Sequence, residues 1–595
     1  MSRLQMSHGR FVALVIGLLA AALALFGVLI VQDFNRALEP ELERRSELIG
    51  TTVQDDVERA LELGIPLHAL VGMEPYVDTL IEDFAELDYV VVRDRDGTAL
   101  HTGGDPPDAV LDERFWVSPS GSREVAGSIA TRYGVATPEA LAGNIDVGVD
   151  GGFVRSRLED LALDLVVIIL VALVVGYEIA LSTGERVAGR RRRSSGVADI
   201  RLILFVFVVA EELSKSFLPQ LTLGATDPDA LLDPAVAVSL PIVAYLLTLG
   251  LASPFAGRLA TSLGQRRLLL LGFAVAAASH LGMVFAETAW QITLLRGLTG
   301  VGYALSTVAS LEYLIERSPG SDRMRAMTTF VFIVIGGTFA GTALGGILAD
   351  RLGYRPVFAV SVILVAAAAL LAWRLLSGTR RGSVAEDPGA FTSRDIRAVL
   401  RQPRLLALLA GVTVPMNVLL AAFLWYLVPL TLAAAGDSPS VIGRTLMLYY
   451  LAVLVAGPIV GRLGGTHITT PTLVGFGALV SGLALLIPSA GVTTMSVSIA
   501  VVVVGLGHAA IRGPQLSLAI ELGEGGGAGA GRGATLAAMR TLERLGSLAG
   551  LLLAALVAAR TDLVTAMAVL AISVTLAGAA YLGVVLVVRR RAQHA

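Results

Sequence analysis

Long apolar runs, separated by short polar segments, fill most of this chain. The first covers 11–31 and the second 161–181. Twelve more follow from Ile200, at approximately 200–221, 235–256, 268–286, 289–314, 325–349, 357–377, 404–432, 441–463, 471–489, 494–519, 533–559 and 563–588. Each run is long enough to cross about 30 Å of hydrocarbon as a helix. The pattern predicts an all-α polytopic membrane protein with a twelve-helix core and two extra N-terminal helices.

One extended polar stretch, 33–158, separates the first two spans. We expect a helix over 39–63, a strand over 89–93 that turns at 94–97 and returns over 98–102, a strand over 144–149, and a helix over 153–164 that continues into the second span. These elements predict a small α/β domain held by two membrane helices. The first run is expected to remain as an anchor, and its alternative is a cleaved signal peptide.

Charge is distributed unevenly and predicts the orientation. The stretch 33–158 has 25 acidic residues against 11 arginines, whereas the rest of the chain has 35 basic and 24 acidic residues. Arg3 and Arg10 precede the first span, four arginines follow the second at 190–193, and three follow the last at 589–591. Because cytoplasmic loops are enriched in basic residues, both termini should be cytoplasmic in a bacterial-type cytoplasmic membrane, with 33–158 extracytoplasmic. This rule explains the four-arginine run better than a nucleic-acid patch does.

The predicted domain boundaries follow from these spans. They are a cytoplasmic N-terminus and anchor (1–32), the extracytoplasmic α/β domain (33–158), a second anchor with a basic linker (159–199), an N-terminal six-helix bundle (200–377), a cytoplasmic linker (378–403), a C-terminal six-helix bundle (404–588) and a basic cytoplasmic tail (589–595).

Composition argues against a soluble enzyme. Hydrophobic residues make up 54% of the 595 residues and charged residues 16%, against roughly 25% charged in soluble domains. The chain has no cysteine, which excludes disulfides and metal–thiolate sites. The glycine-rich segment 525–531 lacks the Lys-Ser/Thr of a phosphate loop and is expected to be a connector. We expect no enzymatic activity, no metal and no cofactor.

A short repeat relates the two halves of the twelve-span core. The pattern Pro-x-x-Gly-Arg-Leu ends the second core span at 254–259 and the eighth at 458–463. Its place in both halves favours two duplicated six-helix bundles. In transporters built in this way, the site lies near the membrane midplane between the repeats.

Three ionisable residues lie midway along the first core span. Glu211 and Lys215, the only lysine in the chain, are four residues apart and should share a helix face and pair, with Glu212 beside them. A carboxylate in a partly dry cavity takes up protons near neutral pH. Two acids against one ammonium leave a spare acid for a proton or cation. The alternative is an ion pair that only holds helices together.

Further polar candidates lie in other core spans. A buried guanidinium in the fourth span needs a partner, unless it extends to the outer interface. In the tenth span a histidine suited to proton exchange precedes an arginine by four residues, and an Arg-Glu-Arg cluster in the eleventh is a substrate contact or a cytoplasmic gate. The candidates are Arg296, Asn417, His508, Arg512, Gln515, Arg540, Glu543 and Arg544.

Four segments resemble motifs of the major facilitator superfamily. Residues 257–267 (GRLATSLGQRR) resemble the loop between its second and third spans, and 296–302 (RGLTGVG) its fourth-span motif. The glycines of 337–346 resemble a fifth-span motif of its antiporters, although Thr342 stands where members usually have proline. Residues 349–356 resemble its fifth-to-sixth loop.

This resemblance implies a transporter whose two bundles rock to expose a central site alternately to each side. Thr261 stands where the family has an acidic residue, which weakens the expectation of an ionic latch between the bundles. The residues expected to act in gating are Gly257, Arg258, Gly264, Arg266, Arg267, Gly341, Gly345 and Gly346.

The extracytoplasmic stretch resembles a small Cache domain, a PAS-like sensor found outside many bacterial membranes. The segments that carry this resemblance are 62–73, 89–103 and 145–150. It implies a small ligand for this domain; a generic α/β insertion is the alternative.

The sequence therefore predicts a secondary active transporter, coupled to protons, with export by antiport favoured and with possible regulation through the outer domain. The expected partners are a polar or charged small molecule, protons and the lipid bilayer, with no nucleic acid. One alternative is a receptor that uses this body for signalling without transport. Another is an outer domain that captures substrate or acts as a lid.

Overall fold

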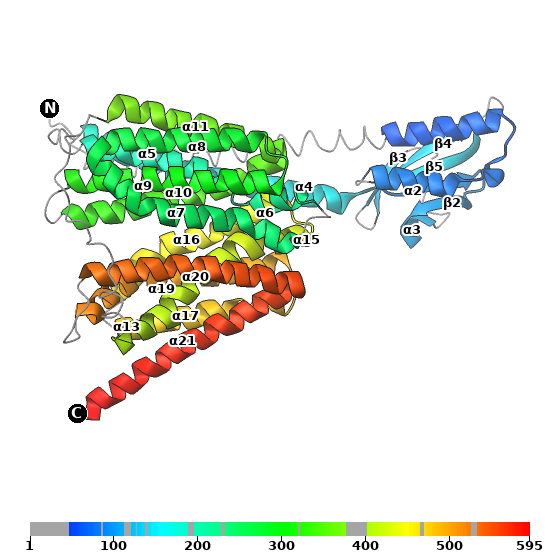
Figure 1. Ribbon diagram of the computed structural model, residues 1–595. Helices are drawn as coiled ribbons and strands as arrows, with labels where there is room; N and C mark the ends of the chain where they lie inside the picture. The colour runs from blue at the N-terminus through cyan, green and yellow to red at the C-terminus, as the bar shows by residue number, and fades with distance from the viewer. Residues whose placement is uncertain are drawn as a thin grey trace, which may run out of the picture. The chain divides into compact units, whose positions relative to one another are not determined.

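The computed structural model (Figure 1) describes residues 47–84, 87–111, 121–125, 128–136, 141–187, 195–227, 232–318, 322–376, 401–463, 469–524 and 532–594. The predicted span 11–31, the arginine run 190–193, residues 378–400 of the predicted linker 378–403 and the glycine-rich connector lie outside these residues. The chain forms two compact units, Ala20–Ile169 and a second unit that includes Leu170–Ala595.

The first unit contains a five-stranded antiparallel sheet. Its strands are β1 (Leu87–Asp94), β2 (Ala99–Gly104), β3 (Gly121–Val125), β4 (Ser128–Ala136) and β5 (Leu141–Asp150), in the order β2-β1-β5-β4-β3. The predicted β1–β2 hairpin and the strand at β5 are confirmed. The sequence analysis missed β3 and β4, which contain glycine, serine and charged residues in place of a clear apolar alternation.

The two faces of this sheet differ. One face forms an apolar core with a helix over 47–62 and with α2 (Met73–Asp83), through buried residues such as Val53, Val77 and Val147. A short η1 (Leu67–Ala69) also packs there. The other face holds Tyr89 and buried charged residues beneath α3 (Asp108–Leu111). This division follows from the period of two in a strand, which sends alternate side chains to opposite faces.

A long helix, α4 (Gly151–Val187), contains the second predicted span as Glu159–Leu181. Its membrane part packs on the core. The guanidinium of Arg201 donates to both carboxylate oxygens of Glu178, with Nε–Oε2 at 2.5 Å and Nη2–Oε1 at 3.0 Å. A bidentate pair of this kind fixes geometry as well as charge, so α4 is held at a defined position against α5.

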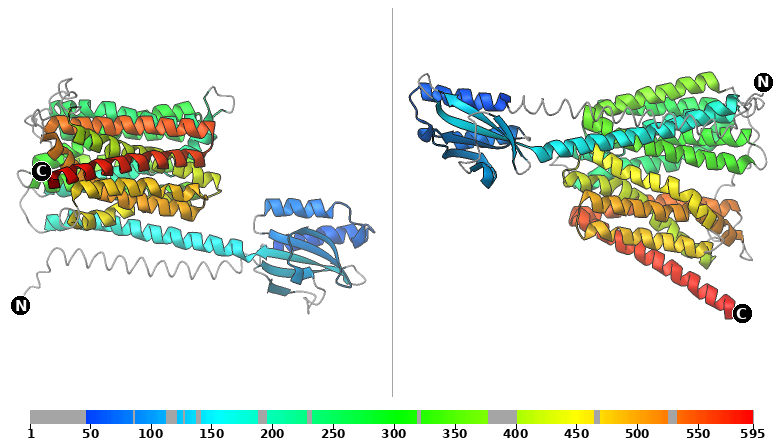
Figure 2. Two further views of the ribbon diagram at one scale, coloured as in Figure 1. Left: turned by 90° about the horizontal axis from the view of Figure 1, so that it is seen from below. Right: turned by 180° about the vertical axis from the view of Figure 1, so that it is seen from behind.

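The first half of the membrane core is a helical bundle, teal to green in Figure 2. Its helices are α5 (Ser195–Glu212), α6 (Leu218–Gly224), α7 (Pro234–Leu263), α8 (Gln265–Val284), α9 (Ala289–Arg317), α10 (Asp322–Leu352) and α11 (Tyr354–Leu375).

The expectation of one continuous helix over 200–221 is wrong, because α5 ends at Glu212 and α6 begins only at Leu218. Pro219 in the first turn of α6 has no N–H to continue the helix ladder, which explains a break just before it.

The second half, yellow to red in Figure 2, repeats the bundle. Its seventh core span is built from α13 (Pro403–Leu408), η2 (Leu409–Thr413), α14 (Val414–Val418), η3 (Leu419–Leu427) and α15 (Val428–Ala434), of which η2 and η3 are π-helical. The remaining helices are α16 (Pro439–Leu463), α17 (Thr470–Ala484), α18 (Leu486–Ser489), α19 (Thr494–Glu524), α20 (Arg532–Arg560) and α21 (Leu563–His594).

Twelve helices within the described residues are long and apolar enough to cross a membrane. They are Glu159–Leu181 and eleven of the twelve predicted core spans. The missing one is the first core span, because α5 has 18 residues and four of them are charged, namely Asp199, Arg201, Glu211 and Glu212. The first core span is thus both charged and interrupted between α5 and α6.

Candidate functional site

The acidic pair forms the end of α5, directly before the break to α6, and is buried inside the membrane unit. Glu211 and Glu212 expose only 3% and 4% of their surfaces. The predicted pairing of Glu211 with Lys215 is not formed. Lys215 pairs with Glu212, because the residues after Glu212 form turns in which the amide of Lys215 bonds to the carbonyl of Glu212. The spacing rule for helix faces does not apply across this break.

Glu211 instead meets a histidine of another helix. The imidazole Nε2 of His280, in α8, lies 3.2 Å from Oε1 of Glu211, and both side chains are almost fully buried. Among the residues that the structure describes, Oε2 of Glu211 and Nδ1 of His280 have no hydrogen-bond partner. The sequence analysis missed His280, although it is the sole ionisable residue in the apolar run 268–286. Counting ionisable groups in every span would have found it.

Lys215, from the N-terminal bundle, lies over two aromatic rings of the C-terminal bundle. Its ammonium lies 4.4 Å from the ring centroid of Trp425 in η3 and 5.9 Å from that of Tyr450 in α16. The indole Nε1 of Trp425 donates to the hydroxyl of Tyr450 at 3.3 Å. We call Glu212, Trp425 and Tyr450 the cation cage. Its acid comes from the N-terminal bundle and its rings from the C-terminal bundle, so it lies at the interface between the predicted halves.

Arg296 is also buried at this level of the first bundle, with 4% of its surface exposed. Its Nη1 donates to Oγ of Ser214 at 3.4 Å, and its guanidinium lies 4.9 Å from the ring centroid of Tyr245 in α7. Its Nε has no hydrogen-bond partner within the described ranges. The alternative in which this arginine extends to the outer interface is therefore wrong. It is instead a second cation beside the acidic pair.

The tenth-span and seventh-span candidates are mostly bound within the C-terminal bundle. Nδ1 of His508 lies 2.8 Å from the hydroxyl of Tyr449. The amides of Gln515 and Asn417 both donate to Thr413, through its Oγ1 at 2.8 Å and its carbonyl at 2.9 Å. These contacts stabilise helix packing. They do not bring the three side chains into the cation cage.

Arg512 differs from its neighbours because its side chain is exposed. It is nevertheless close enough to act electrostatically on Lys215 of the other bundle and on Glu543 in α20. It therefore belongs to the charged surroundings of the interface.

The eleventh-span cluster contributes a contact between bundles. Within the described residues, no ion pair joins Glu543 to Arg540 or Arg544. Arg540 is exposed, whereas Arg544 is partly buried and its Nη2 donates to Oγ of Ser253 in α7 at 3.3 Å. Arg544 therefore joins α20 to α7.

The loop motif at 257–267 forms a tight connection between α7 and α8. Gly264 has φ +83°, a left-handed conformation that other residues rarely adopt, and its N–H caps α7 at the carbonyl of Ala260. Arg266 donates to the carbonyl of Trp373 in α11 at 2.5 Å, so it stays within the same bundle. Arg258 and Arg267 are exposed, and a Cβ on Gly257 would meet only Glu312 at 4.0 Å.

The fifth-span glycines permit close backbone packing on both sides of α10. A Cβ on Gly341 or Gly345 would collide with the α5 segment at Val209 and Leu213. A Cβ on Gly346 would collide with α16 of the other bundle, at the carbonyl of Pro439. Gly341 and Gly345 therefore support the helix that carries the acidic pair, and Gly346 lies at the interface between bundles.

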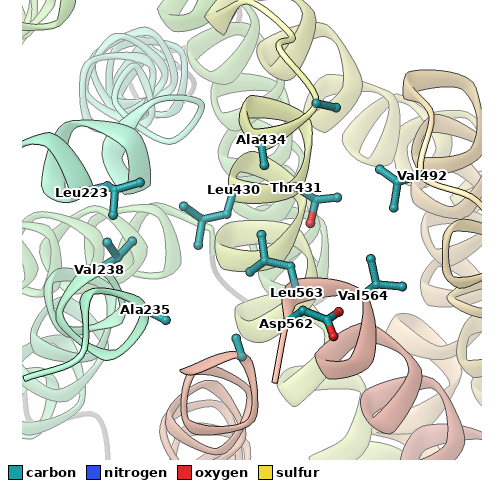
Figure 3. Close-up of a pocket in the computed structure, with 12 residues that line it drawn as sticks. Leu223, Ala235, Val238, Leu430, Thr431, Ala434, Val492, Asp562, Leu563 and Val564 are labelled. Atoms are coloured by element: carbon teal, nitrogen blue, oxygen red, sulfur yellow. The ribbon is translucent and has the colours of Figure 1, made fainter. Parts of the chain in front are cut away.

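A cavity of about 580 Å³ lies at the end of the core where α6 ends and α7 begins. Figure 3 shows it between these elements and the ends of α15, α20 and α21. Its lining is mainly aliphatic, with Thr431 and Asp562 as polar members. The backbone N–H and the hydroxyl of Thr565 bond to Asp562 and lower its pKa. None of the residues predicted from the sequence lines this cavity.

Two hydrogen bonds join the bundles beside this cavity. Nε2 of Gln220 donates to the carbonyl of Pro429 at 2.8 Å, and the hydroxyl of Tyr426 donates to the carbonyl of Ala235 at 2.7 Å. Ala235 itself lines the cavity. The cavity is thus bordered by contacts that must break if the bundles separate at this end.

Comparisons with known proteins agree with this architecture. A model described as Major Facilitator Superfamily matches residues 201–534. The multidrug resistance protein MdtG of Dickeya zeae (strain Ech586) is 27% identical over 248 residues, which are 40% of this chain and 58% of that protein. The PmrA homolog of Lactococcus lactis subsp. lactis (strain IL1403), a multi-drug resistance efflux pump, is 31% identical over 151 residues, or 25% and 36% of the two chains.

The chain therefore spans less than two thirds of these relatives. An auto-inhibited peptide transporter of the POT family has the same fold, with a TM-score of 0.51 at 13% identity over 65% of this chain and 96% of that one. The family model covers more than half of the sequence. The two helical bundles have the same fold as the solved transporter. The chain belongs to the Major Facilitator Superfamily.

Proposed function

We propose that this protein exports small molecules by proton antiport and that Glu211 is the group that exchanges the proton. The observation that carries the proposal is the buried contact between Glu211 and His280, which leaves one carboxylate oxygen and one imidazole nitrogen without partners in the described part of the chain. Buried polar groups normally find partners. Two unfilled positions on titratable groups are therefore places where a proton can be held.

Glu212, the other acid, is better suited to binding a cation than to exchanging a proton. Glu212 is already paired with Lys215, whereas Glu211 has only the histidine. The charged and titratable groups around them are Lys215, Arg296 in α9, Tyr245 in α7, Tyr303 in α9 and Arg512 in α19. Protonation of Glu211 would remove one negative charge from this surrounding and shift the balance between inward-open and outward-open states.

Export as the direction is supported by the names of the relatives, a multidrug resistance protein and an efflux pump. Because the matched region covers only part of each, their substrates are not assigned to this chain. The orientation with both termini in the cytoplasm and 33–158 outside remains our proposal from the charge distribution.

The experiment that tests coupling is substrate flux into proteoliposomes with and without an imposed pH gradient, over a panel of small molecules. The double variant Glu211→Gln, Glu212→Gln should lose gradient-driven flux while the protein remains folded. Glu287→Gln, which changes an exposed acid between α8 and α9, serves as the matched control and should transport normally. Undiminished coupled flux in the double variant would reject the proton role, and ligand binding without flux in the wild type would favour a receptor.

We also propose that the sheet unit regulates the transporter through α4. The supporting observation is the bidentate pair between Glu178 of α4 and Arg201 of α5, the helix that ends at the acidic pair. Deleting 33–158 should change apparent affinity or gating and leave a transport-competent core. If Glu178→Gln reproduces the effect of the deletion, the coupling runs through this pair, whereas a normal transport rate in both variants would contradict regulation.

A further inference from the structure

Resting on the proposed transport function, we infer that the cation cage selects organic cations and that the Lys215 ammonium occupies the place of the substrate's cationic group. Lys215 then acts as a tethered competitor, which a substrate must displace before it binds. This inference names a substrate class and a residue role that proton coupling does not require.

The geometry around the ammonium is that of a cation site. Within about 6 Å of an aromatic centroid, a cation is attracted by the ring face, and Lys215 meets this condition at both Trp425 and Tyr450. The carboxylate of Glu212 supplies the opposite charge. The hydrogen bond from Trp425 to Tyr450 at 3.3 Å fixes the two rings relative to each other. The cage is therefore formed by groups that remain in place when the ammonium leaves.

The same groups disfavour an anion. Aromatic faces carry negative potential, and the cage acid Glu212 repels negative charge. Lys215, the obvious partner for an anion, is already paired with Glu212 and lies over the two rings. An anion would have to remove Lys215 from the cage and then face the cage acid. A cation has only to take the place that Lys215 occupies.

Two features allow Lys215 to leave the cage. It lies in the break between α5 and α6, where turns take the place of the helix, and its side chain is a flexible four-carbon stem. Two further cations, Arg296 and Arg512, are close enough to act on it electrostatically.

A tethered competitor gives a signature that separates it from a binding residue. Removing a group that contacts substrate weakens binding, but removing a group that competes with substrate strengthens it, since the competent state becomes more populated. Lys215→Ala and Lys215→Met should therefore bind an organic cation more tightly, by about tenfold if Lys215 fills the cage most of the time. Trp425→Ala should weaken binding by about tenfold, and Trp425→Phe by less, because indole is the best ring for this contact.

The experiment is equilibrium binding to the purified full-length protein in detergent, with no gradient. The probes are benzyltrimethylammonium and its anionic counterpart of similar size, phenylmethanesulfonate. The inference expects the wild type to bind the ammonium in preference to the sulfonate, with both Lys215 variants tighter for the ammonium. It is overturned if either folded Lys215 variant binds the ammonium more weakly, if the sulfonate is the preferred probe, or if Trp425→Ala leaves ammonium binding unchanged.

Glu211→Gln separates this inference from the proposed proton coupling. That variant should retain ammonium binding in detergent and lose gradient-driven flux in proteoliposomes. Normal flux with normal binding would reject the coupling role of Glu211 and leave the cage intact. Normal coupling in a wild type that binds no ammonium would reject the cage and leave the coupling role intact.

Discussion

Two buried ionic clusters in this protein differ in whether their polar atoms have hydrogen-bond partners. In the sheet unit, the carboxylate of Asp146 accepts a hydrogen bond from Nε of Arg93 at 2.7 Å. It also accepts from Nε and Nη2 of Arg132, at 2.6 and 2.8 Å. Arg93 also donates to the carbonyls of Gly97 and Val110. In the membrane unit, Glu211, His280 and Arg296 each retain a polar atom that has no hydrogen-bond partner among the described residues.

The difference separates a structural role from a functional one. A buried network in which each group is satisfied makes the fold specific, and removing a member leaves an uncompensated charge. A network that leaves buried polar atoms without hydrogen-bond partners is less stable in the resting state. Those atoms are where a proton or a ligand can bind. The sheet-unit cluster ties α3 to the central strands, whereas the membrane cluster is suited to exchange.

The largest expected effect is at the centre of the satisfied cluster. Asp146→Asn removes the anion between two buried arginines and should destabilise the sheet unit by about 3–5 kcal/mol. The measurement is amide hydrogen exchange of β4 and β5 in the full-length protein, with exposed Asp78→Asn as the control. Unchanged protection in Asp146→Asn would contradict the structural reading of this cluster.

The next largest effect is expected for the backbone packing that positions the membrane cluster around Glu211. Gly345→Ala introduces a methyl group that collides with the carbonyl of Leu213, so α10 and the break after α5 must separate. Overpacking of this kind costs about 1–3 kcal/mol and should reduce flux although no charge has changed. Gly513→Ala, in α19 with open space around the new methyl, should be neutral. Equal flux in the two variants would show that the backbone at Leu213 does not position the site.

A smaller change in stability is expected at the acid itself. Glu211→Gln keeps a hydrogen-bonding group opposite His280 and places no new charge, so thermal unfolding should shift by no more than about 1.5 kcal/mol. Gradient-driven flux should nevertheless be lost. A destabilisation as large as that of Asp146→Asn would mean that both clusters are structural and would remove the contrast between them.

The smallest effect is expected at Tyr89, beside the satisfied cluster. Its hydroxyl is buried with no hydrogen-bond partner among the described residues, and its ring packs over Gly148 of β5. Tyr89→Phe keeps the ring and removes the unsatisfied hydroxyl, so chemical denaturation should show stability unchanged or raised by up to about 1 kcal/mol. A clear loss of stability would mean that the hydroxyl has a partner in solution.

The sequence predicted the membrane architecture closely because hydropathy is a local property of each segment. Eleven core spans and the second anchor were found as helices, and the family motifs lie where the resemblance implied. The break after Glu212 was missed because its apolar run continues through Pro219. The strands β3 and β4 were missed because their residues alternate weakly, and their pairing depends on neighbours far along the chain.

Within the candidate site, the sequence by itself determined which charged residues lie inside the membrane unit, because a charge within an apolar run is visible without any structure. Only the tertiary structure decided their partners. Glu211 meets His280 from a position 69 residues away, and Lys215 meets Trp425 and Tyr450 from the other bundle. Such contacts depend on how helices pack and where a helix breaks, and no spacing rule along one segment contains that information.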